Sequence, residues 1–193
     1  FVVEEVYRHF SRLFWVSTLV ASLVSNFVSL AIFGLTPVLD MPDNIPQMQL
    51  HQYWIYLVMG IVLGVAGFMY EKVVLAMPII YKRVGQFFKL PSSYYPILAF
   101  LFIIPIGYFL PHILGGGNQL ILSLNSQHYL LSTLVVFFLI RFIWSMISYG
   151  SGLPGGIFLP ILALGSVLGA IIGNICVQFG LVNEQQFPIF IIL

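Results

Sequence analysis

Charged residues are scarce in this sequence. Lys, Arg, Asp and Glu account for 7% of the 193 residues, whereas soluble domains carry about 25%. Hydrophobic residues account for 60%, and the mean hydropathy is +1.04. So few charged side chains cannot make the surface of a soluble domain hydrophilic. The formal net charge of +1 also supplies no basic surface for nucleic acid. The composition therefore predicts an integral membrane protein and excludes a nucleic-acid partner.

Cysteine is almost absent, because Cys176 is the single one and no internal disulfide can form. Since Cys176 lies in an apolar run, it is predicted to be a small buried hydrophobic residue. The four histidines include no pair at metal-ligand spacing, and the acidic residues form no cluster that suits a metal. No metal and no cofactor are therefore predicted. The sequence also has no recognisable secretory signal.

Long uncharged stretches are abundant, and a transmembrane helix needs about 20 apolar residues. The stretches that qualify are residues 13–33, 53–81, 94–110, 129–148 and 157–179, and a further helix begins near Pro188. In the second stretch, Glu71 and Lys72 interrupt the apolar run, so this long tilted helix is expected to place them at a water-accessible face. Residues 119–124 are too few to cross and predict a re-entrant or surface-lying helix. The predicted fold class is an all-α, multi-pass membrane protein.

The few basic residues are distributed unevenly among the loops. Five of the seven flank the first two spans: Arg8, Arg12, Lys82, Arg83 and Lys89. The loop 34–52 between these spans carries Asp40 and Asp43 and no Lys or Arg. By the positive-inside bias, the basic segments are predicted to be cytoplasmic and the acidic loop external.

One segment of the apolar sequence is rich in Gly and Pro. Residues 150–160 read Gly-Ser-Gly-Leu-Pro-Gly-Gly-Ile-Phe-Leu-Pro, and no charged residue occurs between Arg141 and Glu184. In a bilayer, such irregular backbone is tolerated only where protein buries it or a cavity hydrates it. A helix that starts at the break directs free N–H groups and the positive end of its dipole at the cavity, which suits an anion. The alternative is a kinked helix or a Gly-rich turn buried by its neighbours.

The residue types in this segment suit reversible binding of an anion. Gly155 and Gly156 have no Cβ atoms, so that an ion can approach their backbone closely. Pro160 falls in the first turn of the following helix, where its missing N–H costs nothing. The N–H groups of Ile157 and Phe158 are then left to face the ion. Because the segment contains no Lys or Arg, the ion is not held too tightly to leave.

Small residues also recur within the last long span, where Gly165, Gly169 and Gly173 occupy every fourth position. This spacing allows the backbones of two helices to approach closely. We therefore predict a packing surface for these glycines and assign them no ligand.

The segment 150–160 resembles the signature of the CLC family of chloride channels and proton-coupled chloride exchangers. The family's later anion-site motif, Gly-x-Phe-x-Pro, is matched at every fixed position by Gly156-Ile157-Phe158-Leu159-Pro160. The resemblance extends over essentially the whole chain and includes Glu4-Glu5, the acidic loop and Gly115-Gly116-Gly117-Asn118-Gln119-Leu120. It implies an inverted-repeat fold with tilted and discontinuous helices. Residues 1–193 are then expected to be a partial transmembrane domain, truncated at both ends.

The resemblance also implies roles for individual residues. In this family, the backbone amides of the two residues after the motif's first Gly coordinate the central chloride. Carried over to this sequence, the anion site consists of Gly156, Ile157 and Phe158, and Gly155 and Pro160 support it. The ligand is chloride, which is the transported ion.

Ser151 has a Gly on each side, which raises two alternatives. Residues 150–154 also resemble the family's other chloride motif, Gly-Ser-Gly-Ile-Pro, whose Ser hydroxyl binds the ion. Because Gly156 and its motif follow directly, this turn is the second-half copy, and Ser151 is not assigned as the ligand serine. An intramembrane serine protease would need a His placed to activate Ser151, and Tyr149 stands where a rhomboid-type Gly-x-Ser-Gly motif needs Gly. No catalytic residue is assigned, and the protein is predicted not to be an enzyme.

Two adjacent acids, Glu4 and Glu5, end an apolar helix close to Arg8. One interpretation is a solvated interfacial pair. The other is a proton relay, because ionisable residues near a bilayer are costly and mark ion paths. In the resemblance, Glu5 matches the internal proton-transfer glutamate of the exchangers, where channel members usually have an apolar residue. This favours exchange of chloride for protons and leaves a passive voltage- or ligand-gated chloride channel as the alternative.

The resemblance further implies that the full-length protein is a homodimer in the plasma (inner) membrane, formed partly through residues 13–33. Arg141 lies in the middle of a span, where an unpaired cation is costly. Two roles are open for it: shaping the electric field of the anion route, or pairing with carbonyl groups of a helix.

Overall fold

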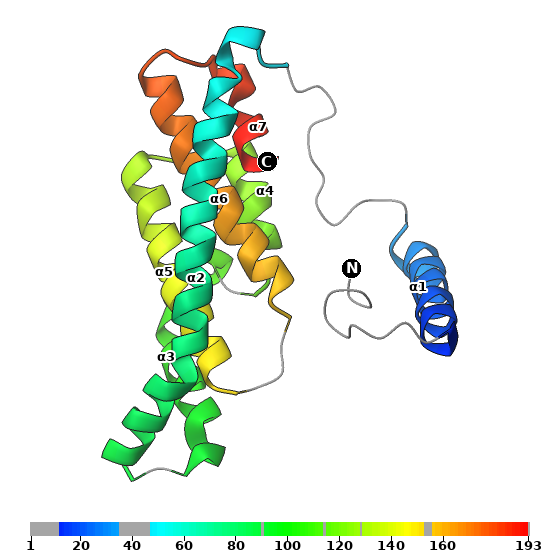
Figure 1. Cartoon of the computed structure of the whole chain (residues 1–193), viewed down its shortest axis with the longest axis vertical. Coiled ribbons are helices and arrows are strands. Elements are labelled where there is room, and N and C mark those ends of the chain that lie inside the picture. Colours follow the sequence, from blue (N-terminus) through cyan, green and yellow to red (C-terminus); the bar gives the residue numbers. More distant parts are fainter. Residues whose placement is uncertain are drawn as a thin grey trace. The chain divides into compact units, whose positions relative to one another are not determined.

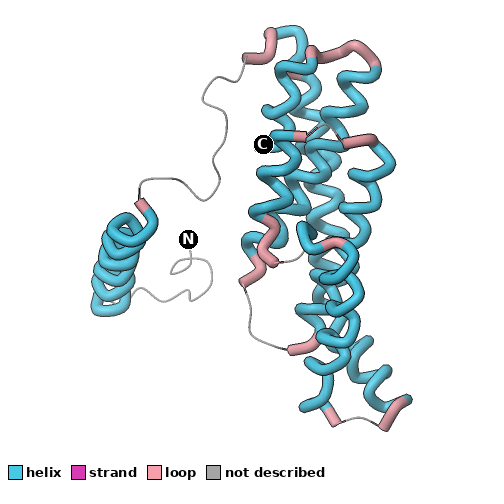
Figure 2. Tube along the Cα trace, turned by 180° about the vertical axis from the view of Figure 1, so that it is seen from behind, coloured by secondary structure: helices cyan, strands magenta, loops and turns pink. Residues whose placement is uncertain are grey.

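The structure, a computed structural model, describes residues 12–34, 47–89, 91–113, 115–127, 129–152 and 156–192. Its α-helices within these ranges are α1 (Arg12–Phe33), α2 (Trp54–Phe87), α3 (Tyr95–Phe109), α4 (Asn118–Ser126), α5 (Leu131–Gly150), α6 (Phe158–Gln178) and α7 (Phe187–Ile192) (Figure 1). Short 3-10 helices precede several of them: η2 (Leu50–Gln52), η3 (Ser92–Tyr94), η4 (Pro111–Ile113) and η5 (Glu184–Gln186). No strand occurs in these ranges (Figure 2), which confirms the all-α prediction.

Four of the described helices, α1, α2, α5 and α6, are long and apolar enough to cross a membrane. Each coincides with a predicted span, and α2 runs for 34 residues, as the long second span requires. The helices α3 and α7 occupy the two remaining predicted positions. Four predicted spans are thus confirmed by length and hydropathy, whereas α3, with 15 residues, is shorter than a span requires and its crossing stays a prediction. The chain is an integral membrane protein.

Helix α1 forms a compact unit of its own. Every side chain described on it is exposed, including large apolar residues such as Leu13, Phe27 and Phe33. Water does not solvate an apolar helix that is exposed all around, so α1 requires lipid or another protein surface against it.

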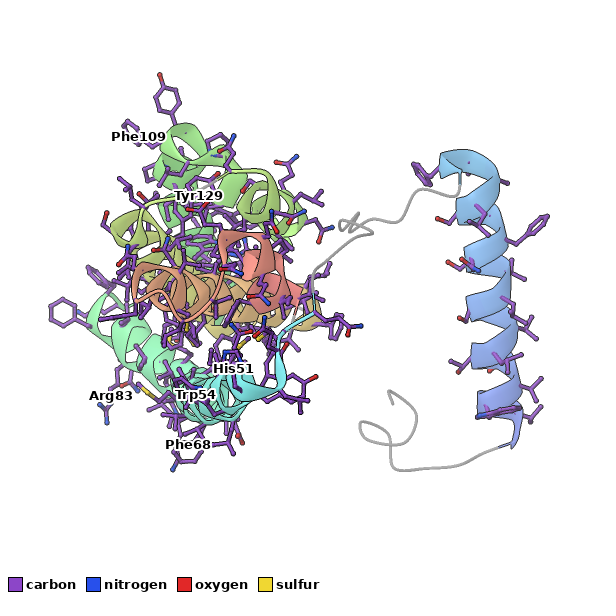
Figure 3. All side chains as sticks on the ribbon, turned by 90° about the horizontal axis from the view of Figure 1, so that it is seen from above. His51, Trp54, Phe68, Arg83, Phe109 and Tyr129 are labelled. Atoms are coloured by element: carbon purple, nitrogen blue, oxygen red, sulfur yellow. The ribbon has the colours of Figure 1, made fainter. Side chains whose placement is uncertain are left out.

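The second unit is a helical bundle with α6 as its central element. Helix α6 packs against α2, α4, α5 and α7, and its residues Ala163, Val167 and Ala170 are completely buried. The outer surface of the bundle is apolar as well: Figure 3 shows Phe68 and Phe109 directed away from it, and both are more than half exposed. An apolar interior together with an apolar exterior is typical of a bundle whose solvent is lipid.

The short helix α4 lies inside this bundle. Its residues Leu120, Ile121 and Leu124 are 1–2% exposed, and α4 packs against α6 and α7. This packing favours the re-entrant placement of the two that were predicted, although Gln119 at the start of α4 is exposed. The apolar face of α4 is buried because η4 and the Gly-rich turn direct the chain back into the bundle.

The glycines of α6 confirm the predicted close packing at two of three positions. A Cβ atom at Gly169 would lie 1.8 Å from the carbonyl oxygen of Phe190, and one at Gly173 would lie 3.0 Å from the Cβ of Phe190. At Gly165, in contrast, a Cβ atom would meet nothing within 4 Å, because this residue lines a cavity. Helix α7 can therefore approach α6 only where the glycines leave the α6 backbone bare.

Replacing Gly169 with alanine is expected to destabilise the full-length protein, because the backbone of Phe190 must move to admit the new methyl group. Overpacking of this kind costs about 1–3 kcal/mol. Gly165→Ala is the matched control: its Cβ enters open space, and alanine favours a helix over glycine by about 1 kcal/mol. Thermal midpoints of the two variants in detergent test this expectation, and equal midpoints would contradict it.

Candidate functional site

The chain breaks where the sequence predicts a break. Helix α5 ends at Gly150, a turn follows in which Gly152 has a φ of +79°, and α6 begins at Phe158. Glycine is favoured at such a φ because it has no side chain to clash. Ile157 is the N-cap of α6, and its carbonyl oxygen accepts a hydrogen bond from the Ile161 N–H at 3.2 Å. Figure 1 shows two separate helices, so the alternative of one continuous, kinked helix is wrong.

The start of α6 presents backbone donors. Helix geometry provides no acceptor within α6 for the N–H groups of Ile157, Phe158 and Leu159. Pro160 occupies the first turn, as predicted, and has no N–H to satisfy. Ile157 and Phe158 are 40% and 72% exposed, so the neighbouring helices do not cover these two residues. The α6 dipole adds partial positive charge at the same end, and the combination attracts an anion.

Two side chains at the end of α5 donate hydrogen bonds to the backbone around the break. The Tyr149 hydroxyl donates to the carbonyl oxygen of Gly156 and so connects the two sides of the break. The Ser151 hydroxyl donates to the carbonyl oxygen of Ser148 at 2.6 Å, within the last turn of α5. The sequence alone does not indicate this role for Tyr149, because a bond across a break depends on how the turn folds.

A cavity of about 630 Å³ adjoins the start of α6 and is lined by residues of α2, α5, α6 and α7 together with Ile157. Most of its lining is apolar, and Tyr70, Glu71 and Ser166 contribute polar groups. Both Glu71 and Lys72 are exposed, and their predicted placement at a water-accessible face stays a prediction. The N-terminal end of α6 thus lies beside this mostly apolar cavity.

Arg141 is buried in the middle of α5, with 3% of its surface exposed. Its Nη1 atom donates to the carbonyl oxygens of Ile113 and Gly115, the latter at 3.0 Å. Its Nη2 atom lies beside Gly117, where a Cβ atom would come within 2.1 Å of it. The predicted pairing with carbonyl groups is therefore confirmed, although these groups belong to η4 and the Gly-rich turn and not to a transmembrane helix. The glycines of that turn leave the room that the guanidinium group occupies.

Several predicted residues lie outside the described part of the chain: Glu4, Glu5, Arg8, Asp40, Asp43 and Gly155. Their proposed roles stay predictions. Lys82 and Arg83, predicted to be cytoplasmic, are exposed on α2, and Figure 3 shows Arg83 directed away from the bundle. Among the described residues, no group of three His, Cys, Asp or Glu is placed to hold a metal ion.

The sequence matches the family model for voltage-gated chloride channels over residues 1–193. It is 32% identical over 179 residues to the H(+)/Cl(-) exchange transporter ClcA of Vibrio vulnificus (strain YJ016). It is also 32% identical over 180 residues to the protein of the same name from Vibrio parahaemolyticus serotype O3:K6 (strain RIMD 2210633). Each match covers 90% of this chain and 37% of the relative, so the chain spans little more than a third of the length of these relatives.

Proposed function

The chain belongs to the CLC family of voltage-gated chloride channels, and on this premise we propose that the full-length protein exchanges chloride for protons across a membrane. Residues 1–193 are a partial transmembrane domain that contributes the second-half part of the chloride pathway. The observation that carries the proposal is the broken helix, because α6 starts anew at Phe158 within an uncharged segment. The relatives named as H(+)/Cl(-) exchange transporters support the choice of ions.

Chloride binds, in this proposal, at the N–H groups of Ile157 and Phe158 beside Gly156. These N–H groups have no acceptor within α6, and an unsatisfied N–H in a membrane costs several kcal/mol. A halide satisfies both groups and meets the positive end of the helix dipole. A Cβ atom at Gly156 would meet nothing within 4 Å, so the space beside the turn is open to an ion. Gly155 and Pro160 support this backbone conformation.

Transport requires that the ion leave as readily as it enters, and the site suits this because it offers only partial charges. No Lys or Arg occurs between residues 142 and 183. Arg141 precedes this segment directly, and its Nη1 donates to the carbonyl oxygens of Ile113 and Gly115. A full positive charge in low dielectric would bind the ion far more tightly than amide dipoles do.

Glu5 is the proposed internal proton carrier, which makes the protein an exchanger. The same residue position is apolar in most channel members, and a carboxyl group is the group that can pick up and release a proton there. A passive chloride channel is the second candidate function, because the matching family is described as a family of channels. The two candidates differ in whether protons move when chloride moves.

We also propose that the full-length protein is a homodimer in the plasma (inner) membrane and that α1 contributes to the dimer contact. All described side chains of α1 are exposed within its own unit, and most are apolar. A second protomer, with lipid around it, would cover this surface.

The proposed function is tested with the full-length protein in liposomes and in crystals. Liposomes loaded with chloride are expected to release it through the protein, whereas protein-free liposomes retain it. Crystals soaked in bromide are expected to show anomalous density within hydrogen-bond distance of the Ile157 and Phe158 N–H groups. Absence of chloride release would contradict the function, and bromide density only at other places would contradict the site.

A further inference from the structure

The hydrogen bond between Tyr149 and Gly156 connects the end of α5 to the residue before the N-cap of α6. Tyr149 lies in the last turn of α5 and is half-buried. Its hydroxyl donates to the Gly156 carbonyl oxygen, seven residues farther along the chain. The peptide group that accepts this bond is the one whose nitrogen belongs to Ile157, which is the first of the two proposed chloride donors.

Because the peptide group is rigid, the position of the Tyr149 hydroxyl affects the direction of the Ile157 N–H. No cis peptide bond occurs among the described residues, so the Gly156–Ile157 peptide is trans and planar. In a trans peptide, the C=O and the N–H point in opposite directions. A hydroxyl that holds the carbonyl oxygen therefore also sets the direction in which the N–H points.

The backbone at Gly156 allows this peptide group more than one orientation. Gly156 has no side chain and the widest choice of backbone conformations, and a Cβ atom there would meet nothing within 4 Å. Within α6, the Ile157 N–H has no acceptor that would hold the peptide from its other end. The bond from Tyr149 therefore holds this peptide group from its carbonyl end.

The same bond strengthens the donor. A carbonyl oxygen that accepts a hydrogen bond polarises its peptide group, and hydrogen bonds in such a chain strengthen one another by about 10–30%. The Tyr149 hydroxyl, the Gly156–Ile157 peptide and an anion would form a chain of this kind, with each N–H or O–H pointing toward the anion. The bond from Tyr149 thus both orients the Ile157 N–H and makes it a stronger donor to the anion.

We infer that Tyr149 is a positioning residue that fixes and polarises the Ile157 amide for the transported anion. The inference rests on the proposed function, in which this amide binds chloride. A donor held in one direction fits an ion of one size and shape, whereas a donor free to turn adapts to several. Tyr149 therefore contributes to the preference for chloride over a larger, planar anion such as nitrate.

The test compares the full-length protein with its Tyr149→Phe variant, which loses only the hydroxyl group. The Kd values for chloride and for nitrate are measured by titration calorimetry in detergent. The loss of one hydrogen bond to the peptide is expected to raise the chloride Kd about threefold to tenfold. The nitrate Kd is expected to rise less, so that the preference for chloride falls.

Tyr81→Phe is the matched control, because the Tyr81 hydroxyl also donates to a backbone carbonyl oxygen of α5, that of Ile147, at 2.7 Å. Tyr81 lies on α2, and its ring packs against Gly150 at the end of α5. Its hydroxyl, however, donates to Ile147 and not to the Gly156–Ile157 peptide. This variant is expected to lower the thermal midpoint while leaving the ratio of the chloride and nitrate Kd values unchanged. If Tyr149 had only a structural role, Tyr149→Phe would also lower the thermal midpoint and leave the ratio of the chloride and nitrate Kd values unchanged.

A ring-fluorinated tyrosine in place of Tyr149 tests the inference with the opposite sign, because fluorine makes the hydroxyl a stronger donor. The chloride Kd is then expected to fall, and this variant also serves if Tyr149→Phe does not fold. The inference is overturned if the unmodified protein binds chloride but the Tyr149 variants keep its Kd values and preference. If the unmodified protein neither binds nor transports chloride, the proposed function fails and this inference fails with it.

Discussion

Replacing Ile157 with proline is expected to raise the chloride Kd of the full-length protein by at least about tenfold. Proline has no N–H, so one of the two proposed donors disappears. A hydrogen bond to a charged group contributes about 1.5–3 kcal/mol, which corresponds to a factor of about 10 to 150 in Kd. The backbone at Ile157 has a φ of −88°, close to the value of about −65° that proline imposes. Helix α6 is expected to keep its start, because it makes no use of this N–H.

The control for this prediction is Ile157→Ala, which removes the side chain but keeps the N–H. Titration calorimetry with chloride provides the two Kd values, and circular dichroism shows whether the helix content is unchanged. If both variants bind chloride equally well, the Ile157 amide is not a ligand. Phe158→Ala is expected to behave like Ile157→Ala, since it too leaves the backbone donor in place.

Replacing Glu5 with alanine is expected to abolish proton movement while chloride still crosses the membrane. Alanine cannot pick up a proton, so the internal end of the proton route is lost. The proposed chloride site is built from the backbone of Ile157 and Phe158 and does not depend on this carboxyl group. In liposomes with a chloride gradient, the proton flux recorded with a pH electrode is expected to fall to the level of protein-free liposomes.

Glu4→Ala is the neighbouring control and is expected to retain coupled proton flux. If Glu4 and Glu5 are only a solvated interfacial pair, the two variants would behave alike. Proton flux that persists in Glu5→Ala would contradict the assignment of Glu5. Chloride flux without any proton flux in the unmodified protein would instead favour the passive channel.

The positions of the helices could be predicted because a bilayer imposes a simple length requirement on each span. The ends of α1, α2, α5 and α6 follow the uncharged stretches to within a few residues, apart from the extension of α2 to Phe87. This extension was missed because Lys82 and Arg83 end the apolar run without ending the helix. Lysine and arginine are good helix formers, so the helix continues through them to Phe87.

The predicted packing was correct only in part. The spacing of Gly165, Gly169 and Gly173 indicates one face of α6, but not which residues of that face another helix covers. Helix α7 is short and covers Gly169 and Gly173 through Phe190, while Gly165 lies over the cavity. The spacing of the glycines does not predict the length or the path of α7.

For this protein, the sequence alone determined the membrane class, the spans and the place of the break, because each follows from how lipid treats charge, length and backbone polar groups. Only the tertiary structure decided which groups meet at the break and beside it. The bond from Tyr149 to Gly156 and the carbonyl partners of Arg141 depend on how separate segments come together. Local sequence sets the conformation of each segment. Contacts between segments depend on how many side chains from different parts of the chain pack together, which no single stretch of sequence specifies.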